Sequence, residues 1–192
     1  MLFRSTGLGP VTTDVGTTLG GSGILAPVGD ATIMIGGNLA PGDGVGTLTF
    51  DLRETAGALT LEPTSTLTFE LDVPGTGDDI AIWGSTGGNV AFNGNVLDFV
   101  DLGGLSEGGV FTLFSFFEDD GVTPMAHGFG PGDLVLGSGL PPALASQLVY
   151  SNNGGTTIDL AIFVIPEPAA VVLAGLGALL LTGRARRRER RA

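Results

Sequence analysis

The chain of 192 residues contains no cysteine and no lysine, and His127 is its only histidine. The absence of cysteine excludes disulfides, thiolate nucleophiles and cysteine-ligated zinc or iron–sulfur sites. A single imidazole excludes a metal site that needs two or three histidines from one chain. Without lysine, the chain has neither a phosphate-loop lysine nor a Schiff-base lysine. The sequence therefore predicts no metal and no cofactor.

Positive charge is scarce everywhere except at the C-terminal end. Residues 1–183 carry 19 acidic residues and only two arginines, Arg4 and Arg53, which gives a net charge of -17. Residues 184–192 carry six arginines and Glu189, a net charge of +5, and the whole chain has a formal net charge of -12. Because an acidic body repels phosphates, we expect no nucleic-acid partner.

Short apolar runs separated by turn residues dominate the body of the chain. Hydrophobic residues make up 43%, and 34 glycines and 11 prolines interrupt them, which favours short strands over long helices. Apolar and polar residues alternate most clearly in Thr47–Leu52 and Thr66–Leu71. An all-β body over residues 1–163 is therefore predicted. The predicted strands are residues 31–35, 46–52, 58–61, 66–71, 79–83, 90–93, 96–101, 110–117, 134–136, 148–151 and 157–164.

The spacing of these runs favours a β-solenoid with rungs of about 20 residues, which stack and bury a shared apolar stripe. Asn38–Phe50 and Ser65–Leu71, with Pro74–Asp79 after them, resemble the passenger-associated β-strand repeats of autotransporter-like surface proteins. The strands between residues 90 and 117 continue the likeness, which covers about residues 36–117. The resemblance implies a right-handed β-helix with a C-terminal β cap and a passive structural or adhesive role.

The C-terminal segment 169–183 reads AAVVLAGLGALLLTG and carries no charge. As a helix it would be about 22 Å long, somewhat shorter than a hydrocarbon core of about 30 Å. Pro168 suits a first helical position, and Arg184 and Arg186 can extend to the lipid headgroups. A single transmembrane helix is predicted, with the tail in the cytoplasm and the body outside. The alternative, a buried helix of a soluble protein, leaves six tail arginines without partners.

The predicted anchor residues are Ala169, Val171, Val172, Leu173, Leu176, Leu179, Leu180 and Leu181, and the predicted cytoplasmic basic tail contains Arg184, Arg186, Arg187, Arg188, Arg190 and Arg191.

Pro166, Glu167 and Pro168 directly precede the apolar segment. The two prolines favour a stiff, extended and protease-accessible stretch. The order Pro-Glu-Pro, short apolar segment and arginine cluster resembles the PEP-CTERM sorting signal of Gram-negative bacteria, over residues 164–192. This resemblance implies tethering in the inner membrane and recognition by an exosortase, a membrane-embedded processing enzyme similar to a transpeptidase. It further implies delivery of the body to the cell surface or extracellular matrix, where polysaccharide is the expected partner.

Proteins with such a sorting signal also carry an export signal at their N-terminus. Residues 1–23 include Arg4 but no apolar run of about 7–15 residues, so they do not resemble a secretory signal peptide. We expect Met1 to be an internal start within a longer gene, and the residues after it to continue a repeat array.

Few side chains of the body suggest chemistry. His127 follows Asp119 and Asp120 along the chain, but no Gly-x-Ser-x-Gly elbow accompanies it, so a structural role is expected. Glu118, Asp119 and Asp120 offer the oxygen ligands that calcium prefers. Their spacing matches no known calcium loop, which favours a solvated acidic turn.

Three functions are consistent with this sequence. The leading hypothesis is a non-enzymatic structural protein of the cell surface or extracellular matrix. The alternative is a glycan- or surface-binding adhesin, which exposed aromatic residues around Trp83 on a flat face would favour; Tyr150 is the only other residue of the Trp/Tyr type. The third is a polysaccharide-active enzyme on a β-helix, which requires converging carboxylates beside an arginine.

Overall fold

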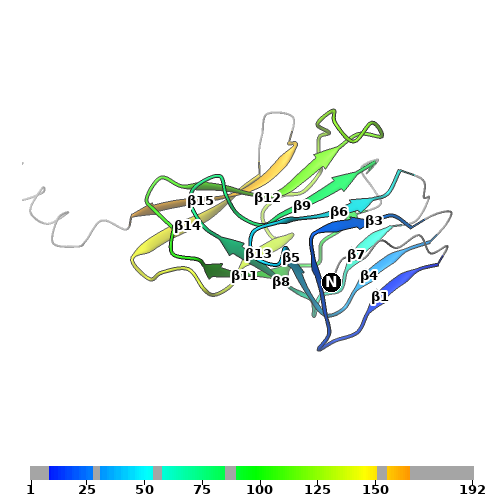
Figure 1. Ribbon diagram of the computed structural model, residues 1–192, viewed down its shortest axis with the longest axis horizontal. Coiled ribbons are helices and arrows are strands. Elements are labelled where there is room, and N and C mark those ends of the chain that lie inside the picture. Colours follow the sequence, from blue (N-terminus) through cyan, green and yellow to red (C-terminus); the bar gives the residue numbers. More distant parts are fainter. Residues whose placement is uncertain (1–8, 28–30, 54–57, 85–89, 151–154, 165–192) are drawn as a thin grey trace, which may run out of the picture.

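The computed structural model of the protein describes residues 9–27, 31–53, 58–84, 90–150 and 155–164 (Figure 1). These residues form an all-β body, and none of them lies in a helix. The first sheet contains β1 (Val11–Thr13), β4 (Ile33–Ile35), β7 (Leu59–Leu61) and β10 (Val90–Ala91). The second sheet contains β2 (Thr18–Gly21), β5 (Asn38–Pro41), β8 (Thr66–Leu71), β11 (Asn95–Asp101) and β13 (Leu134–Leu136). The third sheet contains β3 (Gly23–Leu25), β6 (Thr47–Asp51), β9 (Asp79–Trp83), β12 (Val110–Phe117), β15 (Thr157–Val164) and β14 (Leu144–Tyr150), in that spatial order.

The chain visits the three sheets in turn and then repeats the circuit. β1, β2 and β3 lie in the first, second and third sheets, and the following sets of three strands, up to β12, return to the sheets in the same order. Successive circuits pair in parallel in all three sheets. This is a β-helix-like stack, in which each turn adds one strand to every sheet. Figure 1 shows the stack extending from β1 and β3 at one end to β14 and β15 at the other.

Residues at equivalent positions of successive turns form continuous rows inside the stack. The leucine row of the second sheet consists of Leu19, Leu39, Leu67, Leu97 and Leu136, each paired with the next. The first four of these leucines are buried, whereas the last is only half-buried. Each inward side chain therefore packs on its counterpart above and below, and the hydrophobic effect acts along the whole row.

The third sheet has a corresponding inward row that changes in size along the stack. It consists of Gly23, Leu48, Ile80, Phe114, Ile158 and Tyr150. Across the core, Phe114 meets Phe69 of the second sheet edge-on, with ring centroids 5.7 Å apart. The interior is therefore filled by aliphatic rows with phenylalanine concentrated in the later turns.

The repeat length differs from the sequence prediction. In the first sheet Val11 pairs with Ile33, Ile33 with Leu59 and Leu59 with Val90, so that each step along the chain is longer than the step before it. The two runs with the clearest alternation are β6 and β8, which lie in different sheets and do not stack on each other. The predicted rung length, which was taken from the spacing of these runs, was therefore wrong beyond the first turn, because the connecting loops lengthen along the chain.

Each of the eleven strands predicted from sequence has a counterpart in the structure, within a few residues at each end. Four strands were not predicted: β1, β2, β3 and β5. β2, β3 and β5 are short and contain Gly20, Gly23 or Pro41, residue types that are depleted in strands. Parallel pairing within the stack, rather than local propensity, makes these three segments strands. β1 consists of only three residues, Val-Thr-Thr, whose types favour a strand but whose length gives no alternating pattern.

The last two strands of the third sheet, β14 and β15, depart from parallel pairing. After β13 the chain forms β14, and β15 then returns between β14 and β12, antiparallel to both. A β-bulge shifts the register of β12 between Thr112 and Phe114, so that Leu113 and Phe114 are both buried. An antiparallel pair of strands thus lies at the position where the sequence predicts a C-terminal cap.

Within the residues just described, no helix has the length and apolar character needed to span a membrane. The predicted transmembrane segment 169–183 lies outside them.

Candidate functional sites

The residues of the predicted sorting signal lie outside the described part of the chain. They are Pro166, Glu167 and Pro168, the anchor residues between Ala169 and Leu181, and the arginines of the tail. The last described strand, β15, ends at Val164. The candidate sites below therefore belong to the body.

His127 fastens a long loop to the third sheet. Its Nε2 lies 3.0 Å from the Thr157 carbonyl oxygen, and the Phe129 backbone N–H donates to its Nδ1 at 3.2 Å. This pairing assigns the proton to Nε2, because Nδ1 acts as an acceptor. The imidazole also packs on Phe116, with ring centroids 4.8 Å apart. Both ring nitrogens are used in structural hydrogen bonds, which agrees with the structural role expected from the sequence.

The acidic turn Glu118–Asp120 is closed by its own hydrogen bonds. The carboxylate of Asp120 accepts the backbone N–H groups of Val122 at 2.8 Å and Thr123 at 2.7 Å, and also the Thr123 hydroxyl. Hydrogen bonds from Thr123 lower the pKa of this carboxyl. Among the described residues, no group of three or more His, Cys, Asp and Glu side chains is placed to hold a metal ion.

Trp83 is covered by a charged side chain instead of forming an open platform. The guanidinium of Arg53 lies 4.8 Å from the centroid of the Trp83 ring, within the range of a cation–π contact. The same guanidinium binds both carboxylate oxygens of Asp51, with Nε–Oδ1 2.8 Å and Nη2–Oδ2 2.7 Å, and lowers the pKa of that carboxyl. Gly121 lies beside the indole, since a Cβ added there would be 3.4 Å from the ring.

Two carboxylates on the third sheet come close together in the fold but not in the sequence. The Ser115 hydroxyl donates to Asp79 Oδ1 at 3.1 Å, and the Thr157 hydroxyl donates to Asp159 Oδ2 at 3.1 Å. Burial is the main cause that raises the pKa of Asp79 to about 6, and the charge of Asp159 raises it further. Asp159 Oδ1 is buried and has no hydrogen-bond partner. Asp79, Ser115 and Asp159 come from β9, β12 and β15, so no local pattern in the sequence reveals this group.

Asp78 ties two turns of the stack together. Its side chain is fully buried and accepts the backbone N–H groups of Gly46 at 2.9 Å and Glu70 at 2.7 Å. Burial raises the pKa of this carboxyl to about 6, although both hydrogen bonds act in the opposite direction. Asp78 directly precedes β9 in the chain.

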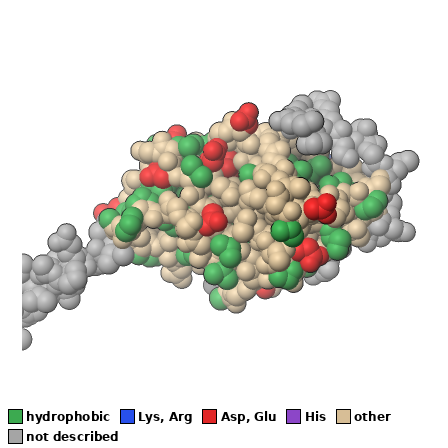
Figure 2. Space-filling model, turned by 90° about the horizontal axis from the view of Figure 1, so that it is seen from below, with side chains coloured by type: hydrophobic (Ala, Val, Ile, Leu, Met, Phe, Trp, Pro, Cys, Tyr) green, Lys and Arg blue, Asp and Glu red, His purple; other side chains and the backbone are tan. Residues whose placement is uncertain are grey.

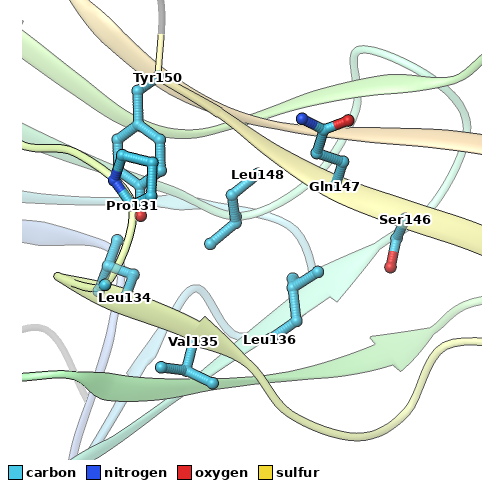
Figure 3. Close-up of a pocket in the computed structure, with 9 residues that line it drawn as sticks. Pro131, Leu134, Val135, Leu136, Ser146, Gln147, Leu148 and Tyr150 are labelled. Atoms are coloured by element: carbon cyan, nitrogen blue, oxygen red, sulfur yellow. The ribbon is translucent and has the colours of Figure 1, made fainter.

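An apolar groove of about 490 Å³ lies between β13 and β14, and we name it the C-terminal groove. Figure 3 shows side chains of both strands and Pro131 around this space. Burial raises the pKa of the Tyr150 hydroxyl. The groove exposes the last members of the two core rows described above, Leu136 and Tyr150. Its principal lining residues are Pro131, Leu134, Leu136, Ser146, Leu148 and Tyr150.

A second groove of about 490 Å³ lies at the opposite end of the stack, beside β1 and β2. Val11, Leu19 and Leu25 supply its apolar surface, and threonines and Asp14 surround them. In the part of the chain that the structure describes, core side chains therefore line a groove at each end of the stack.

The surface between the two ends is acidic. Figure 2 shows scattered Asp and Glu side chains on the face seen from below in Figure 1, with no Lys or Arg among the described residues of this face. Arg53, the only Lys or Arg in the described sequence, is occupied by Asp51 and Trp83.

The stacked strands define a β-helix-like body with a groove at each end. No protein-family model matches the chain. No curated protein shows significant similarity to its sequence.

Proposed function

We propose that this protein is a non-enzymatic structural protein of the cell surface or extracellular matrix, and that residues 164–192 are its PEP-CTERM sorting signal. The observation that carries this proposal is the sequence order Pro-Glu-Pro, uncharged segment 169–183 and arginine cluster, which directly follows a β-rich body. An exosortase and the inner membrane are the partners that such a signal requires, and extracellular polysaccharide is the partner of the delivered body.

The geometry of the body supports a passive role. Three carboxylates are engaged in hydrogen bonds within the body: Asp51 with Arg53, Asp78 with backbone amides, and Asp120 with its own turn. Asp79 and Asp159 accept hydrogen bonds from the Ser115 and Thr157 hydroxyls. Neither carboxylate lines the groove at either end of the stack, whereas a glycosidase places its two carboxylates beside the bound sugar. We further infer that the stack winds right-handedly and that β14 and β15 act as its cap.

The environment of Trp83 gives little support to the adhesin alternative, which the sequence analysis linked to exposed aromatic residues around this side chain. Trp83 is covered by Arg53 and is not part of an open aromatic face. A glycan array probed with the protein separates the two functions. Specific glycan binding that is lost in Trp83→Ala would favour the adhesin.

Localisation tests the proposal directly. The full chain is expressed behind one fixed secretory leader, in a Gram-negative host with and without an exosortase, and cells are fractionated. We expect the intact chain to reach the membrane fraction and to be shortened only when the exosortase is present. Deletion of residues 166–192 should leave the body folded and release it from the membrane.

Matched variants separate the parts of the signal. Replacement of Pro166, Glu167 and Pro168 by alanine should abolish processing but retain membrane association, because the apolar segment is intact. Replacement of the six tail arginines by glutamine should disturb orientation or retention. Membrane retention after deletion of residues 166–192, or equal processing of the alanine variant, would contradict the proposal.

A further inference from the structure

The C-terminal end of the stack is a step, because the three sheets contain different numbers of strands. The first sheet has four strands, the second has five and the third has six, although all three begin in the same turn with β1, β2 and β3. β14 therefore projects one strand beyond β13. The C-terminal groove is the inner corner of this step, with β13 on one side and β14 on the other.

We propose that two copies of the chain interlock at this step, so that β14 of each copy lies beside β13 of the other. A step of one strand is self-complementary: turning a second copy by 180° about an axis between the second and third sheets places its projecting strand in the recess of the first. Such an arrangement is a closed, isologous dimer, in which each contact occurs twice. In this dimer, β14, the last strand of the third sheet in one copy, pairs with β13, the last strand of the second sheet in the other copy. The two sheets thereby join into one continuous sheet, and this happens twice.

The strand edges at the step favour this occupant. In the described residues, β13 pairs only with β11 and β14 pairs only with β15, so each has one unpaired edge. An unpaired edge offers backbone N–H and C=O groups to another strand. The interlocked arrangement uses both edges at once, whereas a single added strand would use only one.

The side chains at the step also favour a second copy over any charged partner. The apolar rows end here with Leu136 and Tyr150, both only half-buried, and Val135 is 47% exposed. No Asp, Glu, Lys or Arg lines the groove, while the segment 1–183 has a net charge of -17. The charge of Asp133 still reaches Tyr150 of the groove. Because like-charged bodies repel, copies of this chain nevertheless meet at lower electrostatic cost at this lining than across the acidic surface between the two ends of the stack.

The absence of cysteine from the chain gives a direct test by disulfide crosslinking. Val135 points outward from β13, and Ala145, Gln147 and Val149 occupy the alternate positions of β14 that do not enter the core. One preparation of the full chain carries Val135→Cys. A second, with a different tag, carries Ala145→Cys, Gln147→Cys or Val149→Cys in turn. The two are mixed in detergent, oxidised, and separated without reductant.

We expect a disulfide-linked heterodimer for at least one of the three β14 positions, and no species larger than a dimer when both cysteines are in one chain. The matched control pairs Met34→Cys with Val122→Cys, two exposed positions away from the step, and should crosslink at least tenfold less. Thr18→Cys on β2 serves as a reporter of the opposite end of the stack.

A charge placed in the groove supplies a second test. Ser146→Glu in both partners should reduce heterodimer formation at least tenfold while the circular dichroism of the fold is retained, and Ser146→Ala should not. Three results would overturn the proposal: no heterodimer at any position, crosslinking equal to the control pair, or preferential linkage of Val135→Cys to Thr18→Cys, which indicates head-to-tail stacking. Membrane targeting plays no part in the readout, so the dimer and the sorting proposal stand or fall separately.

Discussion

His127, Asp78 and Asp79 are polar side chains packed wholly or partly inside the body and hydrogen-bonded there. His127, the one imidazole of the sequence, binds the Thr157 carbonyl oxygen of β15 through Nε2 and accepts the Phe129 N–H of its own loop at Nδ1. Asp78 and Asp79 each have a pKa raised to about 6, with burial as the main cause. A raised pKa means that the folded protein binds the proton more tightly than the unfolded chain does.

The raised pKa values predict that acid stabilises the body over a defined range. Lowering the pH from 7.5 to 5 should raise the free energy of unfolding, because Asp78 and Asp79 bind protons in the folded state near pH 6 but in the unfolded state only near pH 4. Asp79→Asn should raise stability at pH 7.5 and make the pH dependence shallower. Urea unfolding at several pH values in 0.5 M salt measures both effects.

The matched control for this prediction is Asp43→Asn, which removes the same charge from an exposed position. The free energy of unfolding of this variant should change with pH as it does in the unmodified protein. Stability that falls steadily from pH 7.5 to 5 would show that the carboxyls are not protonated in the folded state as described.

Single residues also show where sequence reasoning reached its limit. The loop position of His127 and the turn at Glu118–Asp120 could be anticipated from the local sequence, because glycines and other turn-favouring residues surround both. The group formed by Asp79, Ser115 and Asp159 could not, since its members lie far apart in the sequence. Only the register of β9, β12 and β15 brings them together.

Strands could be predicted where apolar and polar residues alternate strongly. They could not be predicted where pairing with neighbouring turns of the stack, and not the local sequence, produces the strand. β8 shows perfect alternation of half-buried and buried residues, and its bounds agree with the sequence prediction. β2 has the sequence TLGG, which carries almost no strand signal, yet it pairs with β5 along its full length. The repeat was also hidden, because the step from Thr18 to Asn38 in the second sheet is much shorter than the step from Asn95 to Leu134 in the same sheet.

The leucine row predicts a gradient of mutational cost along the second sheet. Leu67→Ala removes a fully buried side chain from the middle of the row and should destabilise the protein by about 2–5 kcal/mol. Leu136→Ala makes the same chemical change at the half-buried end of the row and should cost about 1 kcal/mol or less. Urea denaturation compares the two. Equal costs would mean that the end of the row is as tightly packed as its centre.

The stack is nearly one-dimensional, because each turn contacts mainly the turns before and after it. In such a protein, stability is the sum of individual turns and of the interfaces between them, and opening begins at the ends. The middle strands have neighbours on both sides in every sheet, whereas β1, β2 and β3 have a described neighbour on one side only.

Rates of backbone amide hydrogen exchange should rise from the middle of the stack towards its N-terminal end. Backbone amides of β8 and β9 should exchange slowest, and those of β1 and β2 should exchange at least tenfold faster, because an end turn can open without disturbing the rest. Mass spectrometry of peptic fragments measures the difference. Uniform protection from β1 to β12 would indicate a single cooperative unit and would contradict the picture of semi-independent turns.

The position of β15 determines how the body would withstand mechanical load. The chain leaves the described body through this strand, which lies between β12 and β14 and is hydrogen-bonded on both sides. Tension applied beyond Val164 would act along the strand and would have to shear both ladders at the same time, instead of peeling an edge strand one bond after another. Force applied to the chain beyond Val164 would therefore meet its greatest resistance at β15 itself, and strands with one unpaired edge would separate before it.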